Sequence, residues 1–481
     1  MDRNTNFKIL TNEFYCFEKE FNLFEKKVAD IYIWELVRWG IHRQILQRAG
    51  VYGQTNTTLG SSLDNPRRRI LRGIKNLFVK NAFLSKQCDI LFFGVSRRKK
   101  MEDGLWWDIY CDPVIDHLKH DYSCLLLERP YQGVHLVPSK TSNIRYFDLV
   151  EILASVVRKT KNVRISISKK EQRMLLEIQQ QIEERFDVSI DDLSIIALNK
   201  LLVRKSELIF YSRLLKKCLP RVVVLICSYG EKVLIEACKN LGIPVVELQH
   251  GTSMGRYHPG YSFPKEYKAK LTFPDYLMTF GDFWTNRAEY PIGVDKIFSV
   301  GFPYFEKEAK KYHHIEKKEQ IVFISQGIIG NGKKMSQFAI DLHGKKNFPY
   351  DVIYKLHPGE YAGWADEYPW LIGSGVKVVD SDAVPLYRIL AESKAQVGVY
   401  STVIYEGLGF GLPTFLLNLP GVEYMEELVE SKAVTVISKV DELVEMICQD
   451  AQHKISDEFF FRSNALENVS IMFDAIIRKS D

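Results

Sequence analysis

Residues 221–253 constrain the fold of this chain more than any other segment, because they have the pattern of one strand–helix–strand unit. An apolar run at 222–227 precedes a helical stretch at 230–240, and a second apolar run follows at 245–248. Two strands that are joined through a helix run parallel, since a hairpin turn would make them antiparallel. Helices cover both faces of such a sheet. The segment therefore predicts an α/β fold.

The same alternation of strands and helices starts again after 307–320, a polar and strongly charged segment that we expect to be a linker. Apolar runs at 321–327, 351–358 and 395–401 are separated by stretches with helical periodicity. Two such series in one chain predict two doubly wound parallel-sheet (Rossmann-like) domains that face a cleft.

Helical segments are expected around these two domains. Apolar residues recur at helical spacing through 12–50, and the Gly-, Ser- and Thr-rich segment 52–66 predicts a loop. The predicted parts are an N-terminal helical extension at 1–86, a first α/β domain at 87–306 with a helical insertion at about 150–218, a second α/β domain at 321–445, and C-terminal helices at 446–481.

The charge and the cysteine pattern exclude several classes of protein. The chain of 481 residues has 65 Lys and Arg against 60 Asp and Glu, a net charge of +5, so we expect no nucleic-acid partner. None of its eight cysteines forms a C-x-x-C pair, which argues against a zinc site. The chain starts without an apolar core of signal-peptide length, and no run approaches about 18 apolar residues. We therefore expect a cytoplasmic location.

Segment 67–86 combines seven basic residues and no acidic residue with an apolar stripe. One interpretation is a surface helix that packs on the body of the protein. The other is an interfacial helix that gives peripheral contact with an anionic membrane, at the inner face of the cell membrane. Basic amphipathic helices bind such surfaces without spanning them. The sequence leaves both interpretations open.

Ligands of open parallel sheets bind beyond the carboxyl ends of the strands, so the residues that follow each strand are candidates for a site. His250, Gly251 and Thr252 follow the strand at 245–248, and Arg256 lies just beyond them. An imidazole is the usual general base near neutral pH, and glycine permits close approach of a ligand. The alternative is a loop histidine that bonds a carbonyl group.

A carboxylate is the other candidate in the first domain. Glu102 and Asp103 follow its first strand and could place an acidic group in the site. The neighbouring basic run 97–100 makes a solvated charged loop an equally reasonable interpretation.

Three strand ends of the second domain carry groups suited to a phosphate. A histidine or lysine can neutralise a leaving group, and glycine-rich loops and helix N-termini offer backbone N–H groups to anions. Simple capping and loop roles are the alternatives. The candidates are Lys355, His357 and Pro358 after one strand, Ser401, Thr402 and Glu406 after another, and Ser325, Gln326 and Gly327 after the first.

Three of these motifs together resemble bacterial GT-B glycosyltransferases of surface polysaccharides. They are His-Gly-Thr at 250–252, Lys-x-His-Pro at 355–358, and Ser-Thr-x-x-x-Glu at 401–406 followed by Gly-x-Pro. The chain is similar to the CDP-glycerol glycerophosphotransferases of teichoic acid synthesis, the capsule Kdo transferases, and the bacterial sialyltransferases and polysialyltransferases. The similarity covers about 220–440.

The resemblance implies a GT-B-like fold and a role for each motif. His357 would contact the phosphate of a cytidine-type nucleotide sugar and help its departure, and Ser401 and Thr402 would bind the same phosphate. Glu406 would hold the ribose. His250 would deprotonate the acceptor hydroxyl. The domain at 87–306 would then be the acceptor side, and the domain at 321–445 would bind the nucleotide sugar.

One departure from these families concerns the base. The sialyltransferases use an acid-acid-Gly motif, whereas the strand end here reads Gln-His-Gly and the only Glu-Asp-Gly lies at 102–104. The base is therefore either His250 or a carboxylate. An Asp-x-Asp pair occurs at 380–382, but none lies within the segments proposed for either site as a pair that would hold a metal. We expect inverting transfer without a metal or other cofactor, with the nucleotide sugar as co-substrate.

The expected acceptor is a hydroxyl of a growing capsule, lipopolysaccharide or teichoic-type glycan, free or lipid-linked. Two alternatives remain open. A nucleotide-sugar 2-epimerase or hydrolase of the same architecture would need no acceptor, and a nucleotide-binding scaffold in polysaccharide assembly would have no turnover.

Overall fold

The strand–helix–strand unit predicted at 221–253 is present in the computed structural model. It consists of β8 (Val222–Leu225), α9 (Lys232–Asn240) and β9 (Val245–Leu248), and the two strands pair in parallel. Every residue of β8 and β9 is buried, as expected for strands covered on both faces. The structure describes residues 7–51, 66–160, 163–252, 254–267, 272–327, 329–448 and 457–478.

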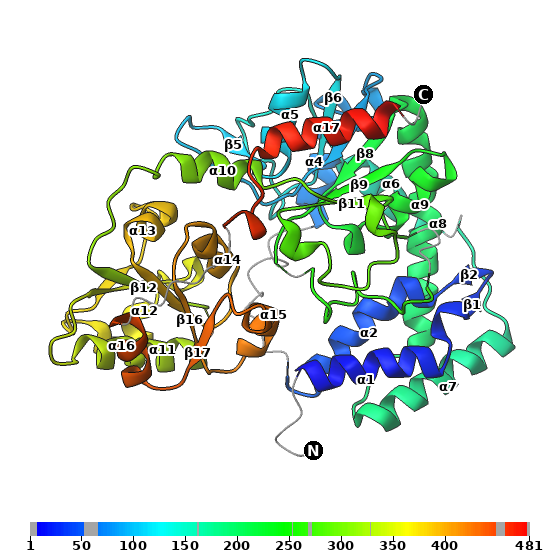
Figure 1. Ribbon diagram of the computed structural model, residues 1–481. Helices are drawn as coiled ribbons and strands as arrows, with labels where there is room; N and C mark the ends of the chain where they lie inside the picture. Colours follow the sequence, from blue (N-terminus) through cyan, green and yellow to red (C-terminus); the bar gives the residue numbers. More distant parts are fainter. Residues whose placement is uncertain are drawn as a thin grey trace. The chain divides into compact units, whose positions relative to one another are not determined.

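The chain divides into two compact units. The first unit runs to Thr279 and continues with Thr285–Pro303 and the residues from Asn464 onward, and the second comprises Phe280–Trp284 and Tyr304–Ser463. The chain therefore leaves the first unit and returns to it. Its helix α17 (Ala465–Arg478) packs beside α5 (Cys111–Leu118) in the first unit, where the two are seen in red and cyan (Figure 1).

The first unit is built on a seven-stranded sheet in which all pairings are parallel. Side chains alternate between its two faces: Ile90 and Phe92 pack toward α5 and α17, whereas Leu91 and Phe93 pack toward the helices on the other face. Besides β8 and β9, the strands are β3 (Ile90–Phe93), β6 (Cys124–Glu128), β7 (Ile144–Tyr146), β10 (Tyr276–Thr279) and β11 (Ile297–Ser299).

Three helices occupy the region predicted to be helical at about 150–218 and confirm that prediction. They are α6 (Asp148–Lys159), α7 (Lys169–Phe186) and α8 (Leu193–Cys218). Ser168 and Glu171 form a capping box at the start of α7, and the Asp192 side chain caps α8. Helix α8 packs against both α6 and α9 and so covers the same face of the sheet.

The helical prediction over 12–50 holds at both ends, but the helix is not continuous. The structure has α1 (Phe7–Glu20) and α2 (Trp34–Arg48), with a short 3-10 helix and the hairpin β1 (Lys27–Val28) and β2 (Ile31–Tyr32) between them. Asn22, Ala29 and Asp30 adopt positive φ angles, which end the first helix and close the hairpin. Leu23 of the 3-10 helix and Val28 of the hairpin are also buried, so apolar residues recur through the break between the two helices.

The predicted basic helix at 67–86 is present as α4 (Pro66–Phe78), followed by the 3-10 helix at Ala82–Leu84. The predicted loop at 52–66 lies almost entirely outside the described residues. A two-stranded hairpin of β4 (Lys99–Lys100) and β5 (Trp106–Trp107) follows β3 and had no signal in the sequence.

The second unit is built on a six-stranded sheet, again with every pairing parallel. Its strands are β12 (Gln320–Ile324), β13 (Asp351–Lys355), β14 (Lys377–Val379), β15 (Ala395–Gly398), β16 (Thr414–Leu417) and β17 (Thr435–Ile437). Its helices are α10 (Pro303–Lys310), α11 (Ile329–His343), α12 (Trp364–Glu367), α13 (Leu386–Glu392), α14 (Thr402–Gly409), α15 (Glu426–Glu430) and α16 (Val440–Cys448).

The prediction of a linker at 307–320 is partly wrong, because both ends of this segment belong to regular elements. Helix α10 reaches Lys310, and Gln320 already belongs to β12. The lysine-rich composition hides an apolar face, since Tyr304, Phe305 and Ala309 are buried.

Both sheets have doubly wound order. In the second unit the order β14-β13-β12-β15-β16-β17 reverses direction between β12 and β15, and in the first unit the order reverses between β3 and β8. Such switch points are where ligands bind in open α/β sheets. The predicted fold class is therefore confirmed as a GT-B-like fold of two doubly wound parallel-sheet units. Within the described ranges, every helix is too short or too polar to cross a bilayer.

Candidate functional site

The switch point of the second unit brings two predicted site segments to neighbouring strand ends. Ser325, Gln326 and Gly327 follow β12, and Ser401 and Thr402 follow β15, which pairs with β12. His357 follows β13, the neighbour of β12 on its other side. Three of the five candidate segments thus lie at one edge of one sheet.

His357 packs against the backbone of the β12 loop. Gly327 has φ of +67°, and a β-carbon placed there would come within 2.8 Å of His357 Nδ1. The backbone N–H of Gly359 donates a hydrogen bond to the same Nδ1 atom, at 3.1 Å. A neutral ring whose Nδ1 accepts carries its proton on Nε2. His357 is exposed, so this N–H can act as a donor to a ligand.

Glu360 holds this arrangement together and was missed as a site residue. Its Oε2 atom accepts from the backbone N–H of His357 at 2.8 Å, and its Oε1 atom accepts from Ser325 Oγ at 3.0 Å and from the Tyr368 hydroxyl at 2.6 Å. The carboxylate therefore joins the strand ends of β12 and β13. The spacing of His357 and Glu360 is that of a capping box, a signal that was available in the sequence.

Lys355 is the last residue of β13 and is 6% exposed. Its ammonium group donates to the Leu356 carbonyl at 3.2 Å and to the Tyr361 hydroxyl, which in turn donates to Asp382 at 2.8 Å. Burial lowers the pKa of Lys355, partly offset by nearby carboxylates such as Asp382. Pro358 begins the short 3-10 turn after His357.

Ser401 caps α14 at the end of β15. Its Oγ atom accepts from the backbone N–H of Val403 at 3.2 Å, whereas Thr402 is exposed. The positive end of α14 and its N–H groups point toward the switch point and favour an anion there. Glu406 lies one turn further, and its Oε1 atom accepts from the buried Tyr387 hydroxyl at 2.9 Å.

Two further features of this edge were missed. The ring of Tyr400 lies on Gly421, where a β-carbon would come within 2.1 Å of the ring, and its centroid is 5.2 Å from that of Tyr424. The planes of the two rings are tilted by 52°, and both rings lie beside the helix end. The Nε2 atom of Gln326 is buried and has no hydrogen-bond partner among the described residues.

The first unit places His250 in the loop after β9. The Tyr110 hydroxyl donates to the His250 carbonyl at 2.5 Å, and the Gln249 side chain donates to the Gly251 carbonyl at 2.8 Å, so the loop is fixed from both sides. Burial lowers the pKa of His250, and its Nδ1 atom has no hydrogen-bond partner among the described residues. A neutral imidazole with an unpaired nitrogen has the properties of a base.

A buried polar cluster adjoins His250. The ring of Tyr229 lies 6.2 Å from that of His250 and 4.7 Å from that of His258, and the Tyr261 hydroxyl donates to Glu247 at 2.6 Å. Burial raises the pKa of Glu247 to about 7 and lowers that of His258 to about 3. The sequence signals for this cluster are a glutamate inside the apolar strand β9 and His258 just beyond the His250 loop.

The other candidates of the first unit lie elsewhere in its loops. Glu102 and Asp103 are in the turn between β4 and β5, where Asp103 accepts from the Trp107 indole at 3.1 Å. Thr252 is half-buried in the His250 loop, and the guanidinium of Arg256 lies 5.8 Å from the centre of the Tyr257 ring.

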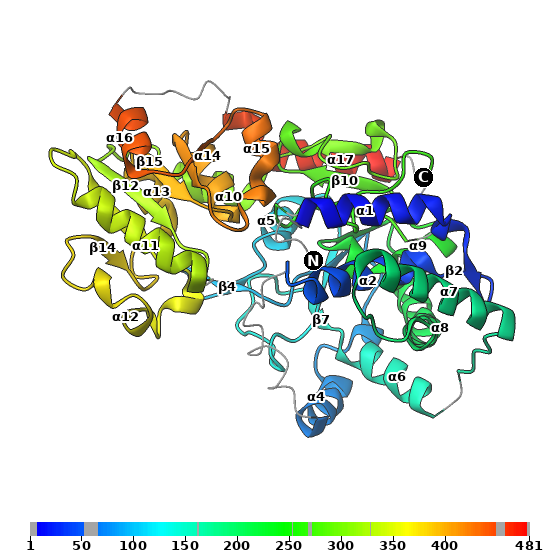
Figure 2. The same ribbon diagram turned by 90° about the horizontal axis from the view of Figure 1, so that it is seen from below.

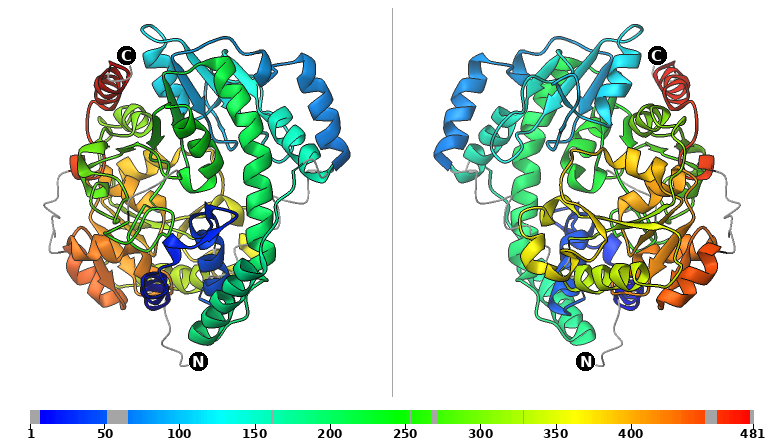
Figure 3. Two further views of the ribbon diagram at one scale, coloured as in Figure 1. Left: turned by 90° about the vertical axis from the view of Figure 1, so that its right-hand side faces the viewer. Right: turned by 90° about the vertical axis from the view of Figure 1, so that its left-hand side faces the viewer.

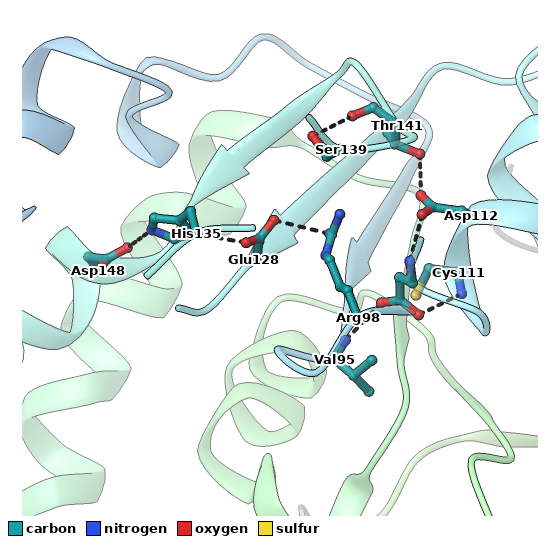
Figure 4. Close-up of polar contacts among 10 residues, drawn as sticks. Val95, Arg98, Cys111, Asp112, Glu128, His135, Ser139, Thr141 and Asp148 are labelled. Carbon is teal, nitrogen blue, oxygen red and sulfur yellow. Dashed lines mark hydrogen bonds and ion pairs between the residues drawn. The ribbon is translucent and has the colours of Figure 1, made fainter. Parts of the chain in front are cut away.

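The ends of β3 and β6 in the first unit carry a buried charge network that was also missed (Figure 4). Asp108 accepts from the backbone N–H of Val95 at 2.8 Å, and a β-carbon on Gly94 would come within 2.5 Å of its carboxylate. The fully buried Arg98 pairs with Glu128 at 3.1 Å. Burial is the main effect on the pKa of Asp108 and raises it, while Arg98 lowers it.

Comparisons with known proteins find solved structures of similar fold but do not assign the chain to a family. No family model matches the chain, and no curated protein matches it. Solved structures of similar fold include the UDP-GlcNAc 2-epimerase from Methanocaldococcus jannaschii, with a TM-score of 0.46, 13% identity and coverage of 80% of this chain and 99% of that one.

Two more structures are similar to the same degree. The UDP-GlcNAc 2-epimerase from Neisseria meningitidis bound to UDP-GlcNAc has a TM-score of 0.47, 14% identity and coverage of 80% and 99%. The wall teichoic acid polymerase TagF has a TM-score of 0.41, 11% identity and coverage of 86% and 97%. Similarity at this level does not identify an activity.

Proposed function

We propose that this chain is a glycosyltransferase that binds a nucleotide-activated sugar at the carboxyl edge of the second sheet. One observation carries the proposal: the imidazole of His357 lies against Gly327, beside the end of β15 from which α14 starts. A donor N–H, a left-handed glycine turn and a helix N-terminus are three devices that bind phosphate.

The donor site divides into parts of different chemistry. His357 Nε2, Ser401 and Thr402 stabilise the negative charge that develops on the departing nucleotide phosphate. Glu406 accepts hydrogen bonds from the ribose hydroxyls. The Tyr400 and Tyr424 rings offer a stacking surface for the nucleobase, for which the motif resemblance favours a cytidine type.

The acceptor hydroxyl is deprotonated by His250 of the first unit. Because burial lowers its pKa, the ring is neutral at physiological pH and able to take a proton. The product is a glycan of the capsule, lipopolysaccharide or teichoic type, formed with inversion and without a metal ion. Gly251, Thr252 and Arg256 flank the base on the acceptor side.

Nucleotide binding tests the donor site directly. A ligand that binds only the folded protein raises the melting temperature, so CMP, CDP, UDP and GDP are compared by thermal shift. We expect the largest shift with CMP or CDP, and we expect His357→Ala to lose it. The matched control is His314→Ala, an exposed histidine of the polar segment before β12. Equal shifts in both variants contradict the donor site.

A product assay separates transfer from the alternatives. Sugar release or epimerisation that is independent of an added glycan acceptor indicates a hydrolase or a 2-epimerase. Nucleotide binding without any turnover, in the wild type and in His250→Ala alike, indicates a scaffold.

A further inference from the structure

Helix α4 presents its apolar side to solvent and its polar side to the protein. Arg72, Gly73 and Asn76 face the body of the first unit, whereas Ile70, Leu71 and Phe78 are 58%, 66% and 84% exposed. An amphipathic helix of a globular protein has the reverse orientation. Exposed apolar stripes of this kind mark sites that bind a membrane or another protein.

The orientation of α4 is fixed by specific contacts. The Arg72 guanidinium donates to Asp148 and, at 2.8 Å, to the Gly133 carbonyl. The Asp148 carboxylate also accepts a hydrogen bond from His135 Nε2 at 2.9 Å, within the network of Figure 4. A β-carbon on Gly73 would come within 2.4 Å of Ile152, so α4 lies directly against α6 (Figure 2). The helix is therefore held with its apolar side outward.

The chain around this stripe is positively charged and has no nearby carboxylate in the sequence. Segment 67–86 has seven basic and no acidic residues. In the described part of the first unit, no ion pair joins Lys75 or Lys86 to a carboxylate. The blue helix α4 lies at the outer edge of the first unit in both views of Figure 3.

A basic hollow is lined by residues that follow α4 in the sequence. It has a volume of about 680 Å³ and is formed where the segment after α4 meets the end of α8. Leu84 and Leu219 at its rim are 67% and 56% exposed. Its lining includes Lys86, Lys216 and Lys217.

We propose that α4 and this hollow form a docking surface for an anionic lipid bilayer, with the apolar stripe in the acyl boundary and the lysines at the headgroup phosphates. Buried apolar area and attraction between cations and anionic lipids add in such contacts. A second copy of the same surface is disfavoured, because an isologous contact would bring like charges together. The proposal names a partner of the first unit and does not depend on nucleotide binding.

Vesicle sedimentation without nucleotide tests the proposal. The full chain is mixed with vesicles of phosphatidylcholine alone or of phosphatidylcholine with 30% phosphatidylglycerol, an anionic lipid fraction of about physiological order. We expect binding to the anionic vesicles only, with a loss as salt is raised. Leu71→Ser combined with Phe78→Ser lowers the bound fraction about tenfold or more.

Matched controls distinguish binding through this surface from nonspecific adsorption to vesicles. Ile195→Ser combined with Val294→Ser changes side chains that are 59% and 71% exposed elsewhere in the first unit, and binding stays at the wild-type level. Lys86→Glu with Lys217→Glu weakens binding, whereas Lys169→Glu with Lys170→Glu on α7 weakens it less. Unchanged binding of the Leu71 and Phe78 variant overturns the proposal, as does wild-type protein that stays in the supernatant. A solution dimer that the same variant dissociates assigns the surface to a second copy instead.

Discussion

The imidazole of His357 lies so close to Gly327 that a β-carbon at 327 would come within 2.8 Å of Nδ1. The two residues belong to loops that follow neighbouring parallel strands, and Glu360 bonds to both loops. The position of the histidine thus depends on a residue without a side chain and on a carboxylate three positions further along the chain.

Gly327→Ala is expected to weaken nucleotide binding about tenfold or more, because alanine is strained at positive φ and its methyl group displaces the histidine ring. Calorimetric titration with the preferred nucleotide measures the change. Gly330→Ala is the control, since a β-carbon there meets no atom within 4 Å. Equal affinities of the two variants would show that the His357 ring is not part of the nucleotide site.

Glu360→Ala is expected to lower nucleotide affinity and to leave the fold intact. The substitution frees the backbone N–H of His357 and the hydroxyl of Ser325, so both loops lose their common acceptor. Titration of the variant alongside Glu445→Ala, which changes an exposed glutamate of α16, isolates the effect. Wild-type affinity in Glu360→Ala contradicts the positioning role.

His250→Ala is expected to lower kcat about 10²–10⁴-fold, the usual contribution of a general base. Nucleotide binding stays at the wild-type level, because the nucleotide is held by the second unit. In the wild type, kcat/KM falls toward acid pH with an apparent pKa below the ordinary value of 6.5, since burial lowers the pKa of His250. An apparent pKa above 6.5 points to another base, and Glu247→Gln then tests the neighbouring carboxyl group.

His258→Gln is expected to reduce the loss of stability in acid. Burial lowers the pKa of His258 from 6.5 to about 3, with His250 and Arg38 acting in the same direction. Between pH 3 and 6.5, His258 is therefore protonated in the unfolded chain and neutral in the folded chain. The stability contributed by the neutral ring is complete above pH 6.5 and is lost as the pH falls from 6.5 toward 3.

Glu247 acts in the opposite direction in part of this range, because its pKa is raised to about 7. The informative quantity is therefore the difference between variant and wild type in the slope of unfolding free energy against pH. Urea unfolding between pH 4 and 8 measures it. Identical slopes in His258→Gln and wild type rule out a buried neutral His258.

Glu18→Gln is expected to destabilise the protein by about 3–5 kcal/mol, because it leaves a fully buried Arg38 without its counter-charge. Two hydrogen bonds of 2.7 Å join these side chains and connect α1 to α2. Urea unfolding measures the loss. Asp191→Asn removes an exposed pair with Arg48 at 3.4 Å and costs about 0–1 kcal/mol. Similar losses in both variants contradict the role of burial.

The sequence was sufficient to predict the parallel sheets, because buried parallel strands are short apolar runs with helical stretches between them. It was insufficient where the chain turns through non-glycine residues, as at Ala29 and Asp30, since nothing local marks a positive φ there. Helix α10 was missed because its second half lies in the charged segment 307–320 and its three buried apolar residues form only a short face.

The strand-end segments of the second unit could be identified from the order of strands along the sequence, because the carboxyl ends of parallel strands lie at one edge of a sheet. Contacts between residues that are distant in the sequence could not be predicted in this way. The contact of Tyr261 with Glu247 and that of Arg98 with Glu128 depend on tertiary packing. A charged residue inside an apolar strand was the available hint in both cases.

The return of α17 to the first unit affects the order in which the chain can fold. Phe473 of this helix packs 6.5 Å from Phe92 of β3, and the whole second unit lies between these residues in the sequence. During synthesis, the first sheet keeps one apolar face without its final helix until more than 150 further residues have emerged. A chain that ends prematurely within the second unit would therefore lack α17 as well, and both units would be incomplete. A chaperone that shields apolar surface would then bind the uncovered sheet face of the first unit.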